Sequence, residues 1–523
     1  MHRFWSFDDL VVQVLDYLER ADQAHVARLR KHLFLLAIPF VWQRPSFKGL
    51  ANLLVESSAY PTTLFAKVRS LMRSNGKPQA NWLGENESTL ERLAFYGAYA
   101  RRLDIVEPGK GHDDDFYAIV NTIFISEYSM EDIFSSLEHI HVTVSTPAFA
   151  AQAFRFAVPT LKYLNLTLIV IGLTEDAPGA RSSDFLPYLL GLPRLDNLQL
   201  YGRATSAEAE AQFLEQTAKH FPAMKKFSAP LMLVDASFFG PLSIMRGLEK
   251  INIQLTYIPF FPSPCILPIL YQLSVTYTRV KDLQCLLEAL SAPLLKALQI
   301  KSNAIRITGS VAEGNTRTYR TLCETVANSW PGLQVFTLSG FPDIITSTEP
   351  PSPWKWTPFS PLLRCQDMRT CTIQTPVKVD VSDADLYSIA DAWPELQHLA
   401  LAIPEGSIVE PPSATFYGLL YLARKCTKLE NVALSMTLIP SGTDELTLPN
   451  VVPNTSVLRL DVHDCPPCDA ALTATLLTRL FPELKRFRFS TRKVVPNDPE
   501  LDGADEQRME AMMEIKARLE LRP

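Results

Sequence analysis

The sequence predicts an α/β solenoid, with parallel strands on its inner side and helices outside, preceded by a small all-α module. Three observations predict it: an apolar phrase that recurs along most of the chain, helical patterns between its copies, and a separate apolar pattern in the first fifty residues. At 523 residues the chain is too long for one compact core, whereas a solenoid enlarges its core by stacking units.

The recurring phrase is L-x-x-L-x-L, with an aliphatic residue or Phe allowed at its second and third apolar places. Successive copies start 22 to 38 residues apart, which is typical of leucine-rich repeats. Strong copies begin at Leu137, Leu161, Leu195, Leu248, Leu270, Leu295, Leu333, Leu396, Leu429 and Leu484. Weaker copies begin at Ala100, Met224, Met368 and Thr455.

The copy at Leu161 indicates how one unit is built. Because side chains alternate along a strand, we expect Leu164 and Leu166 to face the core, and Tyr163 and Asn165 to face outward. Helical patterns lie between copies at 207–220, 282–290 and 384–392. Each unit is therefore predicted to run strand, loop, helix, loop.

The usual side-chain ladder of such repeats is nearly missing. Leucine-rich repeats commonly carry Asn or Cys three places after the last leucine, where the side chain bonds the loop backbone. Among the strong copies only the one at Leu295 has this residue, as Asn303. We expect the loops to be held by Pro and by packing, and the units to vary in length.

The first fifty residues carry a different, purely helical pattern. Residues 8–18 form one apolar stripe, a second stripe runs from 26 to 36, and an apolar run, Phe40-Val41-Trp42, follows Pro39. Two or three short helices cannot easily bury their apolar faces unaided. The module is therefore expected to pack on the array or on a partner.

Residues 1–44 resemble an F-box, in the divergent form that precedes irregular leucine-rich repeats in many fungal proteins. The resemblance rests on the segments DDLVVQVLDYL and HVARLRKHLFLLAIP and on Val41-Trp42. The chain departs from the family pattern at Asp8, where a Pro is usual, at Arg30, where a Cys is common, and at Leu33, where an aromatic residue often lies.

In that family the F-box binds the Skp-type adaptor of a cullin–RING ubiquitin ligase and the repeats hold the substrate. The resemblance thus implies a substrate-recognition adaptor of an SCF-type ligase. The apolar residues expected to face the adaptor or the core of the module itself are Leu10, Val14, Leu15, Leu18, Leu29, Val41 and Trp42. The alternative is a non-ligase leucine-rich-repeat scaffold for protein interactions, in which the first helices only cap the array.

The outward strand residues form the candidate surface for a protein target. This face is nearly neutral and rich in amides and Tyr, which suit contacts to a protein or peptide. The candidates are Tyr163, Asn165, Gln199, Tyr201, Asn252, Gln254, Gln299, Lys301, Arg486 and Arg488. The alternative is a simply solvated face, and the basic cluster at 486–493 is either solvated surface or a docking site for an acidic motif.

Composition excludes several other classes. A net charge of −6 argues against nucleic acid as the main ligand. The apolar runs are too short to span a membrane, and acidic residues occupy the place of a signal peptide's apolar stretch. The eight cysteines are expected to be reduced, so we expect a cytoplasmic or nuclear protein.

No catalytic, cofactor or metal site is expected. The chain lacks phosphate-binding, nucleophile-elbow, dinucleotide-binding and HExxH motifs. The best metal-like segments are Cys465-Pro466-Pro467-Cys468 and His112 with the three aspartates that follow it. The Cys pair with the neighbouring His463 supplies three ligands, whereas structural zinc needs four, and the segment at His112 is interpreted as a charge run in a loop.

The predicted organisation has four parts: an F-box-like module at 1–48, a helical linker or N-terminal cap at 49–99, the irregular array at 100–492, and an acidic loop with a capping helix at 493–523. Three loop-like stretches interrupt the array, at 107–116, 174–184 and 341–361. The third is predicted to be either a lid over the inner face or a disordered insertion, and we favour the insertion.

Overall fold

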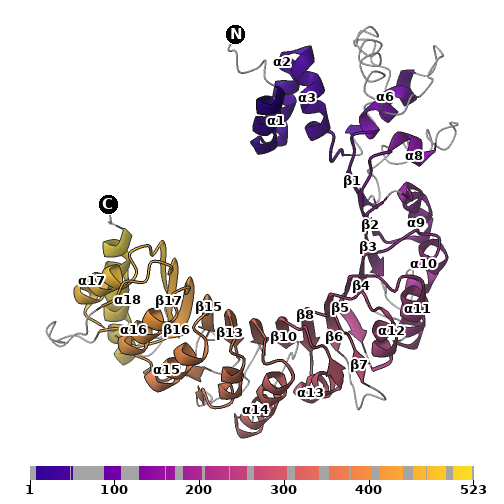
Figure 1. The fold of residues 1–523 in the computed structure, drawn as a ribbon. Helices are drawn as coiled ribbons and strands as arrows, with labels where there is room; N and C mark the ends of the chain where they lie inside the picture. The colour runs from indigo at the N-terminus through magenta and orange to yellow at the C-terminus, as the bar shows by residue number, and fades with distance from the viewer. Residues whose placement is uncertain are drawn as a thin grey trace. The chain divides into compact units, whose positions relative to one another are not determined.

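The structure is a computed structural model with two compact units, Met1–Met224 and Lys225–Pro523. It describes residues 8–46, 49–50, 88–107, 129–159, 161–170, 181–202, 207–234, 236–255, 264–302, 312–340, 353–375, 378–402, 411–439, 451–463, 465–466, 468–490 and 499–520. In each unit parallel strands form one layer and helices cover one of its faces (Figure 1). The predicted fold class is confirmed.

The first unit begins with a three-helix module, made of α1 (Asp8–Tyr17), α2 (Arg20–Leu29) and α3 (Lys31–Val41). Its core contains Val11, Leu15, Val26, Leu33 and Ala37. The start of α1 lies near the start of α3, because the Asp8 carboxylate pairs with the His32 ring at 2.8 Å. The Arg20 guanidinium, at the start of α2, donates to the Val41 carbonyl at the end of α3.

The remainder of the first unit is the first part of the array. Its elements are α6 (Ser88–Gly97), β1 (Arg102–Val106), α8 (Met130–Ile133), β2 (His139–Val144), α9 (Pro147–Ala153), η2 (Phe154–Phe156), β3 (Tyr163–Val170), α10 (Ser182–Leu189), β4 (Asn197–Gly202) and α11 (Ala207–His220). The strands pair in parallel in the order β1-β2-β3-β4.

The second unit continues the same alternation. Its main strands are β5 (Lys226–Val234), β6 (Lys250–Leu255), β8 (Gln272–Tyr277), β10 (Ala297–Ser302), β11 (Val335–Gly340), β13 (Thr370–Gln374), β15 (His398–Ala402), β16 (Asn431–Ser435), β17 (Arg459–His463) and β18 (Arg486–Ser490), and they neighbour one another in that order. Two short pairs, β7 (Cys265–Ile266) with β9 (Leu290–Ser291) and β12 (Trp354–Lys355) with β14 (Val379–Asp380), form separate sheets.

The helices of the second unit lie between these strands along the chain. They are η3 (Ala236–Phe238), α12 (Phe239–Ile244), α13 (Val280–Ala289), α14 (Ala312–Ser329), η4 (Ser360–Arg364), α15 (Asp383–Ala392), α16 (Phe416–Lys425), α17 (Ala470–Leu480) and α18 (Pro499–Glu520). None of the helices in the described ranges is both long and apolar enough to cross a membrane.

Each repeat phrase marks one strand. In all units but one, the strand starts two residues after the first residue of the phrase. The exception is the weak copy placed at Thr455, because β17 starts at Arg459 and the buried phrase is Val457, Leu460 and Val462. Thr455 itself is exposed in the preceding turn, so the predicted start was wrong by two residues.

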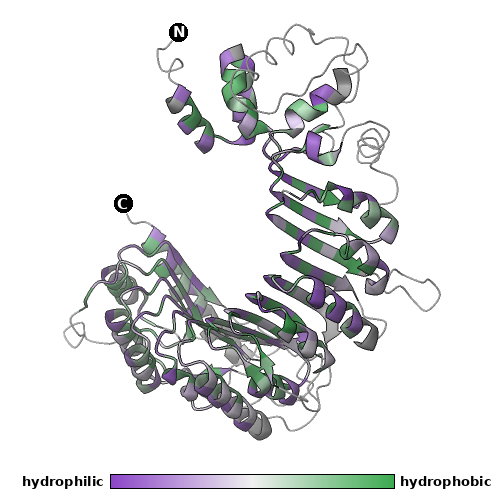
Figure 2. Ribbon diagram, turned by 45° about the vertical axis from the view of Figure 1, so that its right-hand side comes forward, coloured by the Kyte–Doolittle hydropathy of each residue, from purple (hydrophilic) through white to green (hydrophobic). Residues whose placement is uncertain are grey.

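Alternation along the strands is visible in burial and in hydropathy. Along β8, exposure alternates residue by residue, with Leu273 and Val275 buried and Gln272 and Ser274 partly exposed. Figure 2 shows the matching bands of hydrophobic and hydrophilic residues across the strands. One face of each sheet is therefore available to solvent or to a partner.

A side-chain ladder is present, but at another position of the repeat. Three residues before the phrase lies a buried residue, such as Trp330 or Trp393, whose carbonyl accepts the backbone N–H of the first phrase residue. The Cys365 thiol donates to the Trp330 carbonyl at 3.6 Å, and the Cys426 thiol to the Trp393 carbonyl at 3.3 Å. Asn454 continues this ladder. Asn303, the residue expected to serve this purpose, lies outside the described residues.

The helical module is joined to the array through the residues that follow α3. The Gln43 carbonyl accepts the N–H groups of Arg101 and Arg102 at 2.9 and 3.0 Å. The next repeat uses the same pattern, since the Arg101 carbonyl accepts the N–H groups of Glu138 and His139. Gln43 therefore takes the place of a preceding repeat for β1.

The proline-rich stretch 341–361 differs from its prediction where the structure describes it. Trp354, Trp356 and Phe359 are at most 3% exposed, and the Trp354 ring lies 5.2 Å from that of Tyr319 on α14. The aromatic residues of 353–361 are thus part of the core, and this segment is neither a lid nor a disordered insertion. Of the predicted loops at 107–116 and 174–184, residues 108–116 and 174–180 lie outside the described residues, as do residues 341–352. The second loop was predicted to extend too far, because α10 begins at Ser182.

The last helix covers the final repeat with one face. Met512, Ile515 and Leu519 are buried, whereas Met509 and Met513 are 45% and 57% exposed. The helix begins at Pro499, so the acidic segment read as a loop up to residue 504 is helical from residue 499. The part of the predicted acidic loop before Pro499 lies outside the described residues.

Candidate recognition surfaces

The outward face of the first unit carries an aromatic and amide cluster. The rings of His139 and Tyr163 stack with centroids 4.6 Å apart, and the Arg194 guanidinium lies 6.0 Å from the Tyr163 ring centre. The Asn197 amide donates to the Asn165 side-chain carbonyl. These bonds between strands hold the polar side chains in fixed directions, as a recognition surface requires.

Two further predicted residues extend this cluster. The Thr167 hydroxyl donates to the Gln199 side-chain oxygen at 3.3 Å, and Tyr201 is 36% exposed at the end of β4. Tyr163 is 40% exposed. The first unit therefore brings together four predicted target-binding residues, Tyr163, Asn165, Gln199 and Tyr201.

Beside this cluster lies a charged group that sequence reasoning missed. The Asp104 carboxylate on β1 accepts hydrogen bonds from Arg44 and Arg102, with Arg44 at 2.7 Å. Burial alone would raise the pKa of Asp104, but the two guanidinium groups lower it below its usual range. Burial lowers the pKa of His141, whose ring lies 3.9 Å from Asp104. Arg44 belongs to the segment that follows the helical module, so the pair ties that segment to β1.

The predicted residues of the second unit are spread along its sheet. The Asn252 amide donates to the Ser228 hydroxyl at 3.2 Å, Gln299 is partly exposed, and Lys301 is exposed. Gln254 is only 8% exposed and lies beside a β-bulge in β5. Gln254 therefore offers little surface to a partner.

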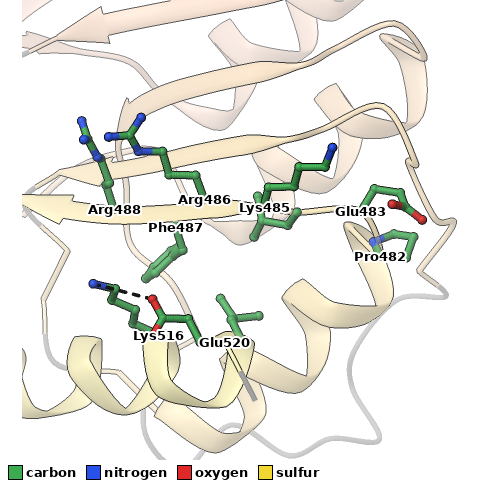
Figure 3. Close-up of a pocket in the computed structure, with 10 residues that line it drawn as sticks. Pro482, Glu483, Lys485, Arg486, Phe487, Arg488, Lys516 and Glu520 are labelled. Carbon is green, nitrogen blue, oxygen red and sulfur yellow. Dashed lines mark ion pairs between the residues drawn. The ribbon is translucent and has the colours of Figure 1, made fainter. Parts of the chain in front are cut away.

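The far end of the second unit is basic. On β17 the Arg459 guanidinium forms an ion pair with the Asp461 carboxylate. The hydrogen bond within this pair raises the pKa of Arg459. Arg486 and Arg488 are exposed and project from the same face of β18, whereas Phe487 projects from the opposite face toward α18 (Figure 3). Neither Arg486 nor Arg488 forms an ion pair with another described residue.

A pocket of about 660 Å³ lies at this end. Pro482, Glu483 and every residue from Leu484 to Arg488 line it, together with Lys516, Leu519 and Glu520 of α18. Lys516 pairs with Glu520 at 3.7 Å, and the other charged residues of the lining are Glu483, Lys485, Arg486 and Arg488. Lys485 and Lys516 carry no recognisable pattern in the sequence, so only the fold could identify them.

In the helical module the structure separates core from surface among the predicted adaptor-facing residues. Leu15 is 1% exposed and Leu18 packs against the same core, whereas Leu29 is 64% exposed. Val14 and Val41 are partly exposed. The Trp42 ring contacts Tyr96 of α6 at 4.6 Å, and the side chain of Leu10 lies outside the described residues.

Two exposed apolar residues of the module were missed because the helical stripe points elsewhere. Tyr17 is 90% exposed and Val12 is 37% exposed. The periodic pattern identifies the face that packs inward. It carries no information about apolar residues on the other faces.

The Cys465–Cys468 pair is buried, with exposures of 2% and 7%. The hydrogen bond between the two thiols has the largest effect on the pKa of each. It raises the pKa of Cys465 and lowers the pKa of Cys468. Within the described ranges, no group of three or more potential ligands for a metal ion occurs. His112 and the aspartates after it lie outside those ranges.

No protein-family model matches the sequence, and no curated protein matches it. Similar solved structures include a TLR13–ssRNA13 complex, with a TM-score of 0.36 and 14% identity over 80% of this chain and 55% of that chain. The chain thus spans about half the length of TLR13 as solved. A Rad7–Elc1 complex from yeast has a TM-score of 0.34 and 11% identity over 84% of this chain and 97% of that chain. With TM-scores below 0.5, these similarities do not indicate what this chain binds.

Proposed function

We propose that the chain is the substrate-recognition adaptor of an SCF-type cullin–RING ubiquitin ligase. The three-helix module binds a Skp-type adaptor, and the outward strand face of the array binds a protein target. In this proposal ubiquitin transfer belongs to the ligase core, and the chain contributes recognition alone. The resemblance of residues 1–44 to an F-box and the repeat architecture support this proposal together.

The observation that carries the proposal is the apolar surface left on the helical module. Its core is already formed by Val11, Leu15, Val26, Leu33 and Ala37. Outside that core, Leu29 at the end of α2 and Tyr17 at the end of α1 are exposed. Burying a large apolar side chain of this kind stabilises a protein or a complex by about 2 kcal/mol. A partner that covers these residues supplies that stabilisation.

The junction with the array suits a module that must present a partner in a fixed direction. The Gln43 carbonyl bonds the first repeat, and Arg44 pairs with Asp104 on β1. These contacts continue the hydrogen-bonding pattern of the repeats into the module. An adaptor bound to the helices is therefore coupled to the array without a free hinge at residue 43.

The second candidate is a leucine-rich-repeat scaffold outside any ligase. The same junction favours it, because a module that replaces a preceding repeat also serves as an N-terminal cap. The two candidates differ in one property, the affinity of the module for a Skp-type adaptor.

Isothermal titration of the full chain with a purified Skp-type adaptor tests the proposal. We expect a one-to-one complex, and we expect Leu29→Lys to weaken it at least about tenfold, because an exposed anchor is lost while a cation at the end of α2 favours the helix. The matched control is Ile266→Lys, since Ile266 is 57% exposed on β7. Leu15 is unsuitable for this test because it lies in the module core.

Two results would count against the ligase role. Absence of binding by the wild-type chain would favour the scaffold. Equal binding by Leu29→Lys and wild type would place the adaptor elsewhere than on the exposed end of α2. Circular dichroism of each variant verifies that the helices are intact.

A further inference from the structure

The pocket at the end of the second unit runs along the open edge of a strand. Side chains alternate between the two faces of a strand, so a pocket lined by every residue from Leu484 to Arg488 must follow the strand's edge. In the described part of the chain β18 pairs only with β17. Among the described residues no strand occupies its second edge, and an edge of this kind can accept an added strand.

Backbone geometry shows which groups lie on this edge. The Arg486 N–H donates to the Leu458 carbonyl at 3.0 Å, on the β17 side. Backbone groups alternate sides along a strand, so the Phe487 N–H and carbonyl point to the open side. An extended peptide can continue the ladder there.

The walls of this edge groove differ in chemistry. On one face of β18 lie the exposed guanidinium groups of Arg486 and Arg488, two residues apart. On the other face Phe487 projects toward α18, where Leu519 and the Lys516–Glu520 pair form the wall (Figure 3). One wall is cationic, and the other carries the exposed Lys516–Glu520 ion pair beside the largely buried side chains of Phe487 and Leu519.

We propose that the edge groove binds an extended acidic segment of a protein target as an added strand beside β18. Carboxylates at positions i and i+2 of the segment lie level with Arg486 and Arg488, and an apolar residue at i+1 faces Phe487 and Leu519. Because strand side chains alternate with a period of two, this pattern matches both walls at once. The inference deepens the proposed function, on which it rests for the existence of a target.

Charge decides in favour of an acidic occupant. Lys485, Arg486 and Arg488 are exposed, and the anion on the same stretch of chain is Glu483. The nearest carboxylate in register with Arg488 is that of Asp461, and Arg459 already binds it. Among the described residues neither guanidinium group has an ion-pair partner, so each can bind a carboxylate of a target with bidentate geometry.

The test uses the full chain and a fluorescein-labelled nonapeptide of alternating Glu and Val, measured by fluorescence anisotropy. We expect binding that weakens about tenfold in Arg486→Glu/Arg488→Glu and weakens as salt rises. The matched control is Arg317→Glu/Arg424→Glu, which makes the same charge change at exposed helix positions of the same unit and is expected to change binding less than about twofold. A peptide with Lys in place of Glu is expected not to bind.

Two N-methylated peptides test the added strand itself. One carries N-methyl groups at odd amides and the other at even amides, and only one set can face β18. We expect one peptide to lose binding and the other to retain it. Equal binding of both would overturn strand addition, and equal binding by the charge-reversed chain would overturn the role of the two arginines.

The remaining outcomes also decide the proposal. No binding of the Glu–Val peptide overturns it, and so does a dimer that Arg486→Glu/Arg488→Glu converts to monomers, because the edge would then pair with a second copy. Failure of the strand-addition proposal can be distinguished from failure of the ligase role. Leu29→Lys is expected to leave peptide binding unchanged, and the arginine reversal to leave adaptor binding unchanged.

Discussion

Asn454 is expected to be the most important single side chain of the repeat ladder. Its amide nitrogen donates to the Ala423 carbonyl at 2.8 Å and to the Cys426 carbonyl at 3.0 Å. Its side-chain oxygen accepts the Ser456 N–H at 2.9 Å. The residue is 5% exposed, so water cannot replace these bonds.

The expected cost follows from these three bonds. A net contribution of about 1 kcal/mol for each gives about 3 kcal/mol for Asn454→Ala. Asn454→Asp has the same shape and retains the bond from Ser456, but it places a second oxygen against two carbonyls. We therefore expect it to be at least as destabilising, although it opens no cavity.

Urea unfolding and hydrogen exchange measure this effect together. Because repeats contact mainly their neighbours, the loss of protection should concentrate in β16 and β17. The control is Asn431→Ala, which removes one side-chain bond to His398 at a partly exposed site and is expected to cost less than about 1 kcal/mol. If Asn454→Asp were as stable as the wild-type chain, the hydrogen bonds of Asn454 could not be holding the repeats together as described.

Three further predictions concern packing, acid stability and thiol reactivity. Gly418→Ala should destabilise the second unit by about 1–3 kcal/mol in thermal unfolding, because the new Cβ would lie 2.4 Å from a carboxylate oxygen of α15, whereas Gly240→Ala, with nothing within 4 Å, should not destabilise it. The pKa of Asp380 is lowered, since hydrogen bonds from a Lys and a Ser outweigh the opposing effect of burial. Its contribution should therefore be present above about pH 4 and be lost as pH falls through the lowered value, and Asp380→Asn should flatten that part of the acid-unfolding curve. Burial raises the pKa of Cys426 to about 12, so iodoacetamide at pH 8 should modify the partly exposed Cys285 long before Cys426, and equal rates would contradict this burial.

The strands were predictable because their signal is local. Alternating apolar residues after each leucine report burial on one face, and that periodicity does not depend on distant contacts. The weak copy near Thr455 failed for a local reason too. The segment from Thr455 to Val462 contains two overlapping phrases, and only the turn at Asn454 selects the later one.

Other features depend on tertiary packing and lay beyond the sequence. The Trp-rich segment at 353–361 has loop-like composition, yet its rings are buried against α14 and the repeat that follows. We expected the side chains that bond the neighbouring repeat to follow each strand. Cys365, Cys426 and Asn454 make these bonds from positions before the strand. Periodicity locates a side chain on a face but does not report which neighbours cover it.

The same limit applies to the candidate surfaces. Helical spacing grouped Leu15 with Leu29, and the fold places one in the core and the other on the surface. Outward strand positions were correct for Tyr163 and Lys301, whereas Gln254 is covered beside the bulge of β5. The edge groove combines β18 with a helix that follows it in the chain, so its Lys516 wall required the structure.

The ligase role is tested most directly by titration of the full chain with a Skp-type adaptor, comparing wild type with Leu29→Lys and Ile266→Lys. We expect a one-to-one complex that Leu29→Lys weakens at least about tenfold and Ile266→Lys leaves unchanged. A wild-type chain that shows no affinity for the adaptor would contradict the ligase role and leave the array as a scaffold.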